Sequence, residues 1–253
     1  MPTLAEAAYY REKFTRDPLW SSQGPNTDEM ARWTAIERML DGLPALASRR
    51  LLDVGCGRGW LTNLASRYGE TQGLEPVIEV ADFARRMYPA LRFHSCTLPE
   101  LIQTPEFQPF DVVLSSEVIE HVPSAEQRQF VATLRCVVRI GGTLILTAPR
   151  REMFERWRSL RKCLPKRLRA DPDQPIEEPL TERELQSMLV ESGFRIERHA
   201  RAYVRYRALS PANALLGVRW IERVLSLPAL ARLRRLLHWR WALYQVWCAQ
   251  RTS

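Results

Sequence analysis

The sequence lacks several features that would assign it to a broad class at once. Its five cysteines are scattered without a CxxC pair, no run of 18 apolar residues occurs, and no apolar stretch follows a basic start at the N-terminus. Disulfide frameworks, membrane-spanning helices and secretory signals each require one of these patterns. We therefore expect a protein of a reducing compartment, with the cytoplasm as its default location.

Size and composition fit one ordinary globular domain. The 253 residues are enough for a single large α/β domain with insertions. Apolar residues make up 45% and charged residues 26% of the chain, which excludes wholesale disorder. No internal repeat is visible, so a repetitive architecture is not expected.

Positive charge is concentrated in two segments. Residues 150–169 hold nine Arg and Lys against two Glu, a net +7, and residues 207–253 hold eight Arg against one Glu, again +7. Because the whole chain carries +8, the remainder is acidic, with a net −6. Such basic segments favour phosphate-bearing or anionic-lipid partners, and the alternative is a solvated basic surface without special function.

Short apolar runs alternate with helical patterns from residue 50 onward. Runs of this length suit strands buried on both faces, and strand–helix alternation is typical of a doubly wound parallel sheet. We expect an α/β fold with a mostly parallel seven-stranded sheet, and Gly141 with Gly142 predicts the turn into the fifth strand. The predicted strands cover residues 50–54, 71–74, 91–93, 111–114, 143–147, 194–206 and 243–248.

The pattern divides the chain into three parts. Residues 1–48 form a helical segment, residues 49–206 form the core with a basic helical insertion at 150–180, and residues 207–253 form a basic amphipathic C-terminal segment with the last strand. The helical segment either caps a ligand cleft or packs on the sheet edge. Its apolar residues at helical spacing are Met30, Trp33, Ile36, Met39 and Leu40.

Two capping boxes predict where later helices begin. Ser124 is followed three residues later by Gln127, and Thr181 is followed by Glu184. In such a box the hydroxyl accepts a hydrogen bond from an otherwise unpaired backbone N–H of the first turn.

A glycine-rich turn directly follows the first predicted strand. The sequence reads LLDVGCGRG, with Asp53 before the turn and a helix predicted to begin near residue 60. Alternate glycines let the backbone adopt conformations barred to other residues and approach a ligand closely. Because nicotinamide and flavin folds also open with GxGxG, the triplet alone leaves the cofactor open. The residues of this predicted cradle are Asp53, Gly55, Cys56, Gly57 and Gly59.

The flanks of the turn resemble the first motif of class I S-adenosylmethionine-dependent methyltransferases. In that family the acidic residue before the glycines holds the methionine amino group, which implies this role for Asp53. Glu75 ends the next predicted strand, 22 residues later, where a carboxylate can bind both ribose hydroxyls. After the third strand the family often has an Asp near the adenine, but here Cys96 or Thr97 takes that place. His94 is interpreted as a structural residue at the strand end.

The fourth predicted strand ends in polar residues beside the expected transfer site. Ser115 and Ser116 are expected to face the methionine portion of the cofactor. Glu117, Glu120 and His121 then match the ExxEH stretch of the ubiquinone-biosynthesis O-methyltransferase family, with agreement of the core motifs over roughly residues 50–150. The resemblance implies that these three side chains hold a divalent cation such as Mg²⁺, which lowers the pKa of a hydroxyl acceptor. Alternatively, His121 is a general base, or it only packs at the strand end.

The two basic segments give an indication of where the protein meets its methyl acceptor. Met153, Trp157, Leu160, Leu164 and Leu168 recur at helical spacing among arginines, which predicts an amphipathic helix suited to an anionic membrane surface or to a lid over the site. Tryptophans and arginines recur in the C-terminal segment. If these segments bind a membrane surface, the protein is expected to lie peripherally on the inner face of that membrane.

Four functions remain open from the sequence. The leading hypothesis is O-methylation of a small or lipid-linked acceptor, such as an isoprenoid phenol or a lipid-borne sugar. RNA methylation is disfavoured, because no (N/D)PPY tetrapeptide follows the fourth strand and no RNA-binding module is visible. The third function is that of a non-catalytic binding protein that retains the fold, and the fourth is that of an NAD-dependent oxidoreductase.

Overall fold

The structure is a computed structural model of the whole chain. It describes residues 4–16, 24–44, 48–162, 176–202 and 242–253, and all structural statements below refer to these ranges. Most of the basic C-terminal segment, residues 207–241, and residues 163–175 of the predicted insertion therefore lie outside the described residues.

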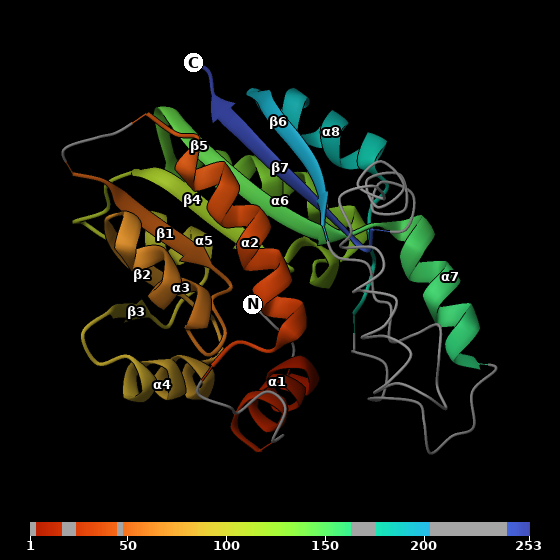
Figure 1. Cartoon of the computed structure of the whole chain (residues 1–253). Coiled ribbons are helices and arrows are strands. Elements are labelled where there is room, and N and C mark those ends of the chain that lie inside the picture. The colour runs from red at the N-terminus through yellow and green to blue at the C-terminus, as the bar shows by residue number, and fades with distance from the viewer. Residues whose placement is uncertain (1–3, 17–23, 45–47, 163–175, 203–241) are drawn as a thin grey trace, which may run out of the picture.

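A seven-stranded sheet forms the centre of the protein (Figure 1). The strand order is β3-β2-β1-β4-β5-β7-β6, and β7 runs antiparallel to both of its neighbours. All seven predicted strands are confirmed, with ends that differ by a few residues, and positions 203–206 of the sixth lie outside the described part. The strands are β1 Arg50–Val54, β2 Glu70–Leu74, β3 Arg92–His94, β4 Phe110–Ser116, β5 Val138–Pro149, β6 Phe194–Ala202 and β7 Tyr244–Arg251.

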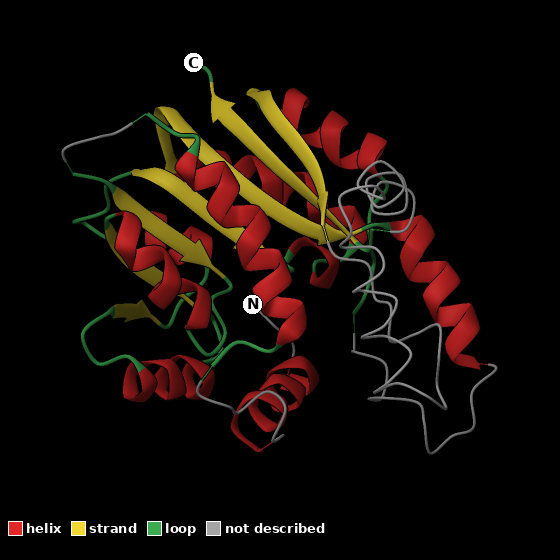
Figure 2. Cartoon of the chain, in the orientation of Figure 1, coloured by secondary structure: helices red, strands yellow, loops and turns green. Residues whose placement is uncertain are grey.

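Helices cover both faces of this sheet (Figure 2). On one face α2 and α3 pack against β1, β4, β5 and β7, and on the other face α5, α6 and α8 pack against the same strands. The helices are α1 Leu4–Arg16, α2 Thr27–Asp41, α3 Trp60–Ala65, α4 Ile78–Met87, α5 Leu98–Ile102, α6 Ser124–Val137, α7 Arg151–Lys162 and α8 Glu182–Glu191, with short 3₁₀ turns η1 Ser66–Tyr68 and η2 Ile119–His121.

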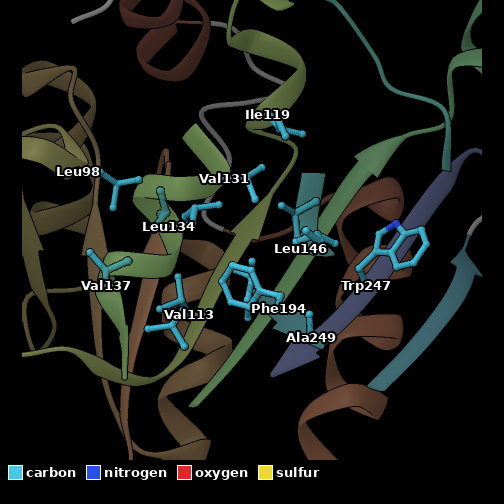
Figure 3. Close-up of a cluster of buried hydrophobic side chains, with 14 of the residues drawn as sticks. Leu98, Val113, Ile119, Val131, Leu134, Val137, Leu146, Phe194, Trp247 and Ala249 are labelled. Carbon is cyan, nitrogen blue, oxygen red and sulfur yellow. The ribbon is translucent and has the colours of Figure 1, made fainter. Parts of the chain in front are cut away.

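Alternation along each strand supplies two hydrophobic cores. In β4, Val113 faces the cluster under α6 that Figure 3 shows, whereas Val112 and Leu114 face α2 and α3. Strands buried on both faces hold the sheet in one register, because a slip by one residue would exchange these faces. The two cores therefore fix which side chains emerge at the strand ends.

Two local predictions about turns and caps need correction. Residue Ser124 makes no capping bond, because Pro123 is the N-cap of α6, and the side chain of Gln127 instead donates to the carbonyl oxygens of Ile119 and Val122. Gly141 does not end a turn before the strand. It lies inside β5, with φ of 74°, where the pairing with β4 is irregular.

The cap predicted at Thr181 is confirmed. Its hydroxyl accepts a hydrogen bond from the N–H of Glu184, whose carboxylate accepts from the N–H of Thr181. Two more complete boxes, which the sequence pattern did not reveal, are formed by Asn26 with Glu29 at the start of α2 and by Thr97 with Glu100 at the start of α5.

The N-terminal segment contains two helices. Trp33, Ile36, Met39 and Leu40 of α2 are buried against the sheet, whereas Met30 is 41% exposed and does not belong to this face. The other helix, α1, lies beside α4 (Figure 1).

The basic insertion begins as a helix, α7, which extends away from the sheet beyond the end of β5 (Figure 1). Among the described helices, none combines the length and the apolar character needed to cross a membrane.

Candidate functional site

The loop after β1 is shaped by glycines in the left-handed region. Gly55, Gly57 and Gly59 have φ values of 68°, 53° and 81°, which disfavour any residue with a Cβ. A Cβ on Gly55 would lie 2.5 Å from Val118, and one on Gly59 would lie 2.8 Å from Phe93. The sequence therefore needs glycine here both for the turn and for the close packing around it.

Hydrogen bonds hold this loop in place. The N–H groups of Gly55 and Cys56 both donate to the carbonyl oxygen of Leu74, at 2.8 and 3.0 Å. The Cys56 side chain packs in a small core with Ala84 and Phe93, and burial raises the pKa of its thiol. The Cys56 sulfur is thus enclosed in this small core, and the role of Cys56 in cofactor binding stays a prediction.

Two buried carboxylates stand on either side of the loop. Asp53, near the end of β1, is 1% exposed and accepts a hydrogen bond from the Thr62 hydroxyl at 2.7 Å. Glu75 follows β2 and accepts from the N–H groups of Gly57 at 3.1 Å and Val77 at 3.0 Å. The structure therefore brings together the two acidic residues that were selected from the sequence.

Neither carboxylate has a positively charged partner among these contacts. Burial raises the pKa of Asp53 to about 7, and the Thr62 hydrogen bonds only partly oppose this. Burial likewise raises the pKa of Glu75 to about 7, against the two backbone N–H groups that lower it. Buried carboxylates with pKa values near neutrality are typical of sites built to meet a charged or strongly hydrogen-bonding ligand.

The residues after β3 serve local structure. The N–H of Thr97 donates to Glu100 at 2.7 Å at the start of α5, and Cys96 packs partly buried against the core under α6. His94 Nε2 hydrogen-bonds the Gln72 side chain at 2.8 Å, as expected of a structural residue. A contact from Cys96 to the adenine stays a prediction.

The end of β4 carries a chain of polar side chains. Ser116 Oγ lies 3.0 Å from Thr147 Oγ1, which in turn donates to Glu117 Oε1 at 2.9 Å. Ser115 is buried, and its hydroxyl has no hydrogen-bond partner among the described residues. Because β1 and β4 are neighbours, Ser115 lies directly beside Val54, where the glycine loop begins.

Backbone strain marks the next residue. Glu117 has φ of 58° and is the non-glycine residue with positive φ in the described ranges. A left-handed non-glycine residue costs on the order of 1–3 kcal/mol, and such residues concentrate at ligand sites. Burial raises the pKa of Glu117, and repulsion from Glu120 raises it further.

The imidazole of His121 is held by one ring nitrogen. Its Nδ1 lies 2.9 Å from the carbonyl oxygen of Ile176, and because a carbonyl only accepts, Nδ1 carries the hydrogen. Nε2 then keeps its lone pair, and Glu120 Oε1, at 3.9 Å, is too far for a hydrogen bond. Burial lowers the pKa of His121.

Helices α1 and α2 contribute residues to which the sequence assigned no individual role at the site. The Phe14 ring lies 3.4 Å from the position of a Cβ on Gly57, and the Tyr10 ring meets His121 edge-on at 5.9 Å between centroids. From α2, Arg32 reaches Glu117, with 3.7 Å between Nη1 and Oε2. Only the packing of α1 and α2 in the tertiary fold brings these residues to the site.

The described donors do not form a metal centre. No group of three or more His, Cys, Asp and Glu side chains in the described ranges is placed to hold a metal ion. One oxygen of Glu117 accepts from Thr147, and the other faces the guanidinium of Arg32. The predicted divalent cation at Glu117, Glu120 and His121 has no support from this arrangement.

Comparison with known sequences gives a consistent result. The sequence profile of a family described as a methyltransferase domain matches residues 28–199. The ubiquinone biosynthesis O-methyltransferase of Rattus norvegicus is 34% identical over 110 residues, 40% of this chain and 31% of that protein. The enzyme of the same name from Rhizobium leguminosarum is 35% identical over 121 residues, 46% and 44% of the two chains. The matched region thus spans less than half of either relative.

Solved structures resemble the whole described fold. The N-methyltransferase NodS from Bradyrhizobium japonicum, solved with S-adenosyl-L-homocysteine, has a TM-score of 0.64 at 12% identity, covering 98% of this chain and 99% of that one. A SAM-dependent methyltransferase from Archaeoglobus fulgidus has a TM-score of 0.61 at 16% identity, covering 96% and 99%. At such identities the likeness establishes the fold alone.

Proposed function

Because this chain belongs to the methyltransferase-domain family and has the class I S-adenosylmethionine-dependent methyltransferase fold, we propose that it methylates a hydroxyl group of a small or lipid-linked acceptor, with S-adenosylmethionine as the methyl donor. The observation that carries this proposal is the pair of buried carboxylates, Asp53 and Glu75, on either side of the left-handed glycine loop.

The loop and its two acids suit this cofactor. Bound S-adenosylmethionine supplies an electrophilic methyl group on a sulfonium ion. Asp53 would bind the methionine amino group, and Glu75 would bind the ribose hydroxyls, since a carboxylate can accept from both. Gly55, Gly57 and Gly59 leave room for the backbone to approach the ligand, and Ser115 and Ser116 border the methionine side.

His121 would accept the proton that the acceptor hydroxyl loses. Its tautomer supports this role, because the bond from Nδ1 to Ile176 leaves the Nε2 lone pair available. Methyl transfer to oxygen requires alignment and a deprotonated nucleophile, so a neutral base at the end of β4 supplies much of what the chain must provide.

The acceptor class rests on the curated relatives. Both relatives compared above are ubiquinone biosynthesis O-methyltransferases by name, which supports a phenolic acceptor on an isoprenoid chain. The arginine-rich sequence of α7 supports delivery of such an acceptor from an anionic membrane surface at the inner face of a membrane. Nothing in the described site favours a nucleic-acid acceptor over this class.

Two measurements test the proposal. S-adenosylmethionine should raise the melting temperature of the protein, and NAD should not, because only the first matches the acidic pair. Incubation with methyl-labelled S-adenosylmethionine and prenylated catechols should then transfer label to the lipid extract. Stabilisation by NAD alone, or binding of S-adenosylmethionine without transfer to any hydroxyl acceptor, would overturn the donor or the reaction respectively.

A further inference from the structure

Two buried carboxylates lie near each other just after β4. Glu120 is 2% exposed and Glu117 is largely buried, and the two lie close enough to raise the pKa of Glu117 by repulsion. Buried carboxylates in proteins are paired with an opposite charge, coordinate a metal ion or take up a proton, and burial raises the pKa of both Glu117 and Glu120 to about 8. In the ubiquinone O-methyltransferase motif that this stretch resembles, the carboxylates are expected to coordinate a metal ion.

In this chain, an arginine provides the opposite charge. Arg32 emerges from α2, is 8% exposed, and places Nη1 at 3.7 Å from Glu117 Oε2. Its guanidinium carbon lies 5.2 Å from the ring centroid of Tyr244 at the start of β7, so an aromatic face covers the charge. A helix that precedes the core thus delivers a fixed cation to the end of β4.

The surroundings keep this guanidinium charged. Burial alone would lower the pKa of Arg32, but Glu117, Tyr244, Glu29 and Glu120 raise it above its ordinary value. Guanidinium also tolerates burial better than ammonium because it is weakly hydrated. Arg32 is therefore a permanent positive charge beside Glu117, and its charge also lowers the pKa of Glu120.

We propose that the guanidinium of Arg32 is the counter-cation of Glu117 and Glu120, and that it takes the place of a divalent metal ion at this site. A metal ion would need oxygens at about 2.0–2.6 Å, in a region where one Glu117 oxygen already faces the guanidinium and the other accepts from Thr147. Two cations beside one carboxylate would repel each other.

The inference rests on the proposed function only in placing these carboxylates beside the transfer site. It assigns Arg32 as a positioning residue for the carboxylate pair. If it holds, methyl transfer by this chain proceeds in the presence of chelators, and the resemblance to the metal-binding motif extends to the residue types but not to their use.

The test is a titration with Mn²⁺ alone, read by the electron paramagnetic resonance of the free ion and by thermal unfolding. The full chain is treated with EDTA, desalted and compared with Arg32→Met and with Arg32→Lys, which keeps a cation. The wild-type and Arg32→Lys proteins should bind no stoichiometric Mn²⁺. Arg32→Met should bind one equivalent and gain roughly 3–5 °C in melting temperature for each tenfold excess of Mn²⁺ over its dissociation constant.

Each outcome decides the matter. One equivalent of Mn²⁺ on the wild-type protein, lost in Glu117→Gln, would overturn the proposal, as would a folded Arg32→Met protein that binds none. If Arg32→Met does not fold, the wild-type titration decides alone. Because no cofactor or acceptor is present, failure of this proposal is distinguishable from failure of methyl transfer.

Discussion

The ion pair between Arg58 and Glu29 offers a strong test of how the glycine loop is held. Arg58 belongs to the loop itself, and Glu29 is the third residue of α2, where it also closes the capping box with Asn26. Both side chains are 2% exposed, and the guanidinium also donates to the Gly24 carbonyl oxygen at 3.0 Å. Replacing Arg58 by Met keeps much of the volume but leaves the Glu29 carboxylate without the guanidinium.

The size of the effect follows from burial. Removing one partner of a buried pair costs about 3–5 kcal/mol, because the remaining charge stays in a poorly solvated place. For a chain of this length each kcal/mol lowers the melting temperature by about 2–4 °C, so Arg58→Met should melt about 6–20 °C lower. The loss should be much smaller when Glu29 is also replaced by Met, since no isolated charge then remains.

A matched control lies on the same helix. Glu37 pairs with Arg67 at 3.1 Å, but the two side chains are 30% and 54% exposed. Such pairs contribute at most about 1 kcal/mol, so Glu37→Gln should change the melting temperature by only a few degrees. Equal effects of Arg58→Met and Glu37→Gln in urea and thermal unfolding would refute the reasoning from burial.

Three further predictions concern stability in the absence of cofactor. Thr181→Ala should lower the free energy of unfolding by about 1 kcal/mol through loss of the helix cap. Ser124→Ala should change it by less than about 0.5 kcal/mol, because Ser124 makes no capping bond. Equal losses for the two variants in urea unfolding would contradict Pro123 as the N-cap of α6. Between its unfolded pKa near 4 and its folded pKa of about 7, Asp53 holds a proton in the folded protein but not in the unfolded chain. The contribution of this residue to the free energy of unfolding therefore falls as pH rises through that window, by on the order of 4 kcal/mol. Asp53→Asn should abolish that contribution, which unfolding curves at pH 5 and pH 8 would measure. An unchanged pH dependence would show that the carboxyl is not buried as described. Gly59→Ala should lower the melting temperature more than Gly141→Ala. Both glycines have positive φ, but only an alanine at position 59 would place its Cβ against a side chain. Similar losses for the two variants would argue against the tight packing of the loop.

The fold was predictable because its signals are local. Strands β1, β4 and β5 contain short apolar runs, and a glycine turn, an acidic residue or a helix start follows most of the strands. The same locality explains the errors. Serine is a typical helix cap, but Pro123 rather than Ser124 is the N-cap of α6. Glycine is typical of turns, but β5 continues through Gly141.

The cofactor side of the site was predictable for a related reason. Asp53 lies near the end of β1 and Glu75 directly follows β2, so parallel pairing alone brings them to one edge of the sheet. Arg32, Tyr10 and Phe14 lie on helices that precede the sheet, and no local pattern says where such helices dock. The interpretation of Glu117 and Glu120 as metal ligands failed to account for Arg32 because its approach is a property of tertiary packing.

The most direct test of the account is a calorimetric titration of S-adenosylmethionine into the wild-type protein and three variants with one acidic residue neutralised. Asp53→Asn and Glu75→Gln remove a charged acceptor from the loop, and a hydrogen bond to a charged group contributes about 1.5–3 kcal/mol, so each should weaken binding by roughly 10- to 150-fold. Asp111→Asn is the control, because that carboxylate accepts from the N–H of Arg50 at 2.8 Å, at the opposite end of β1. The account predicts weak binding by the first two variants and wild-type affinity for the third. Wild-type affinity in both loop variants, with the fold intact by circular dichroism, would contradict it.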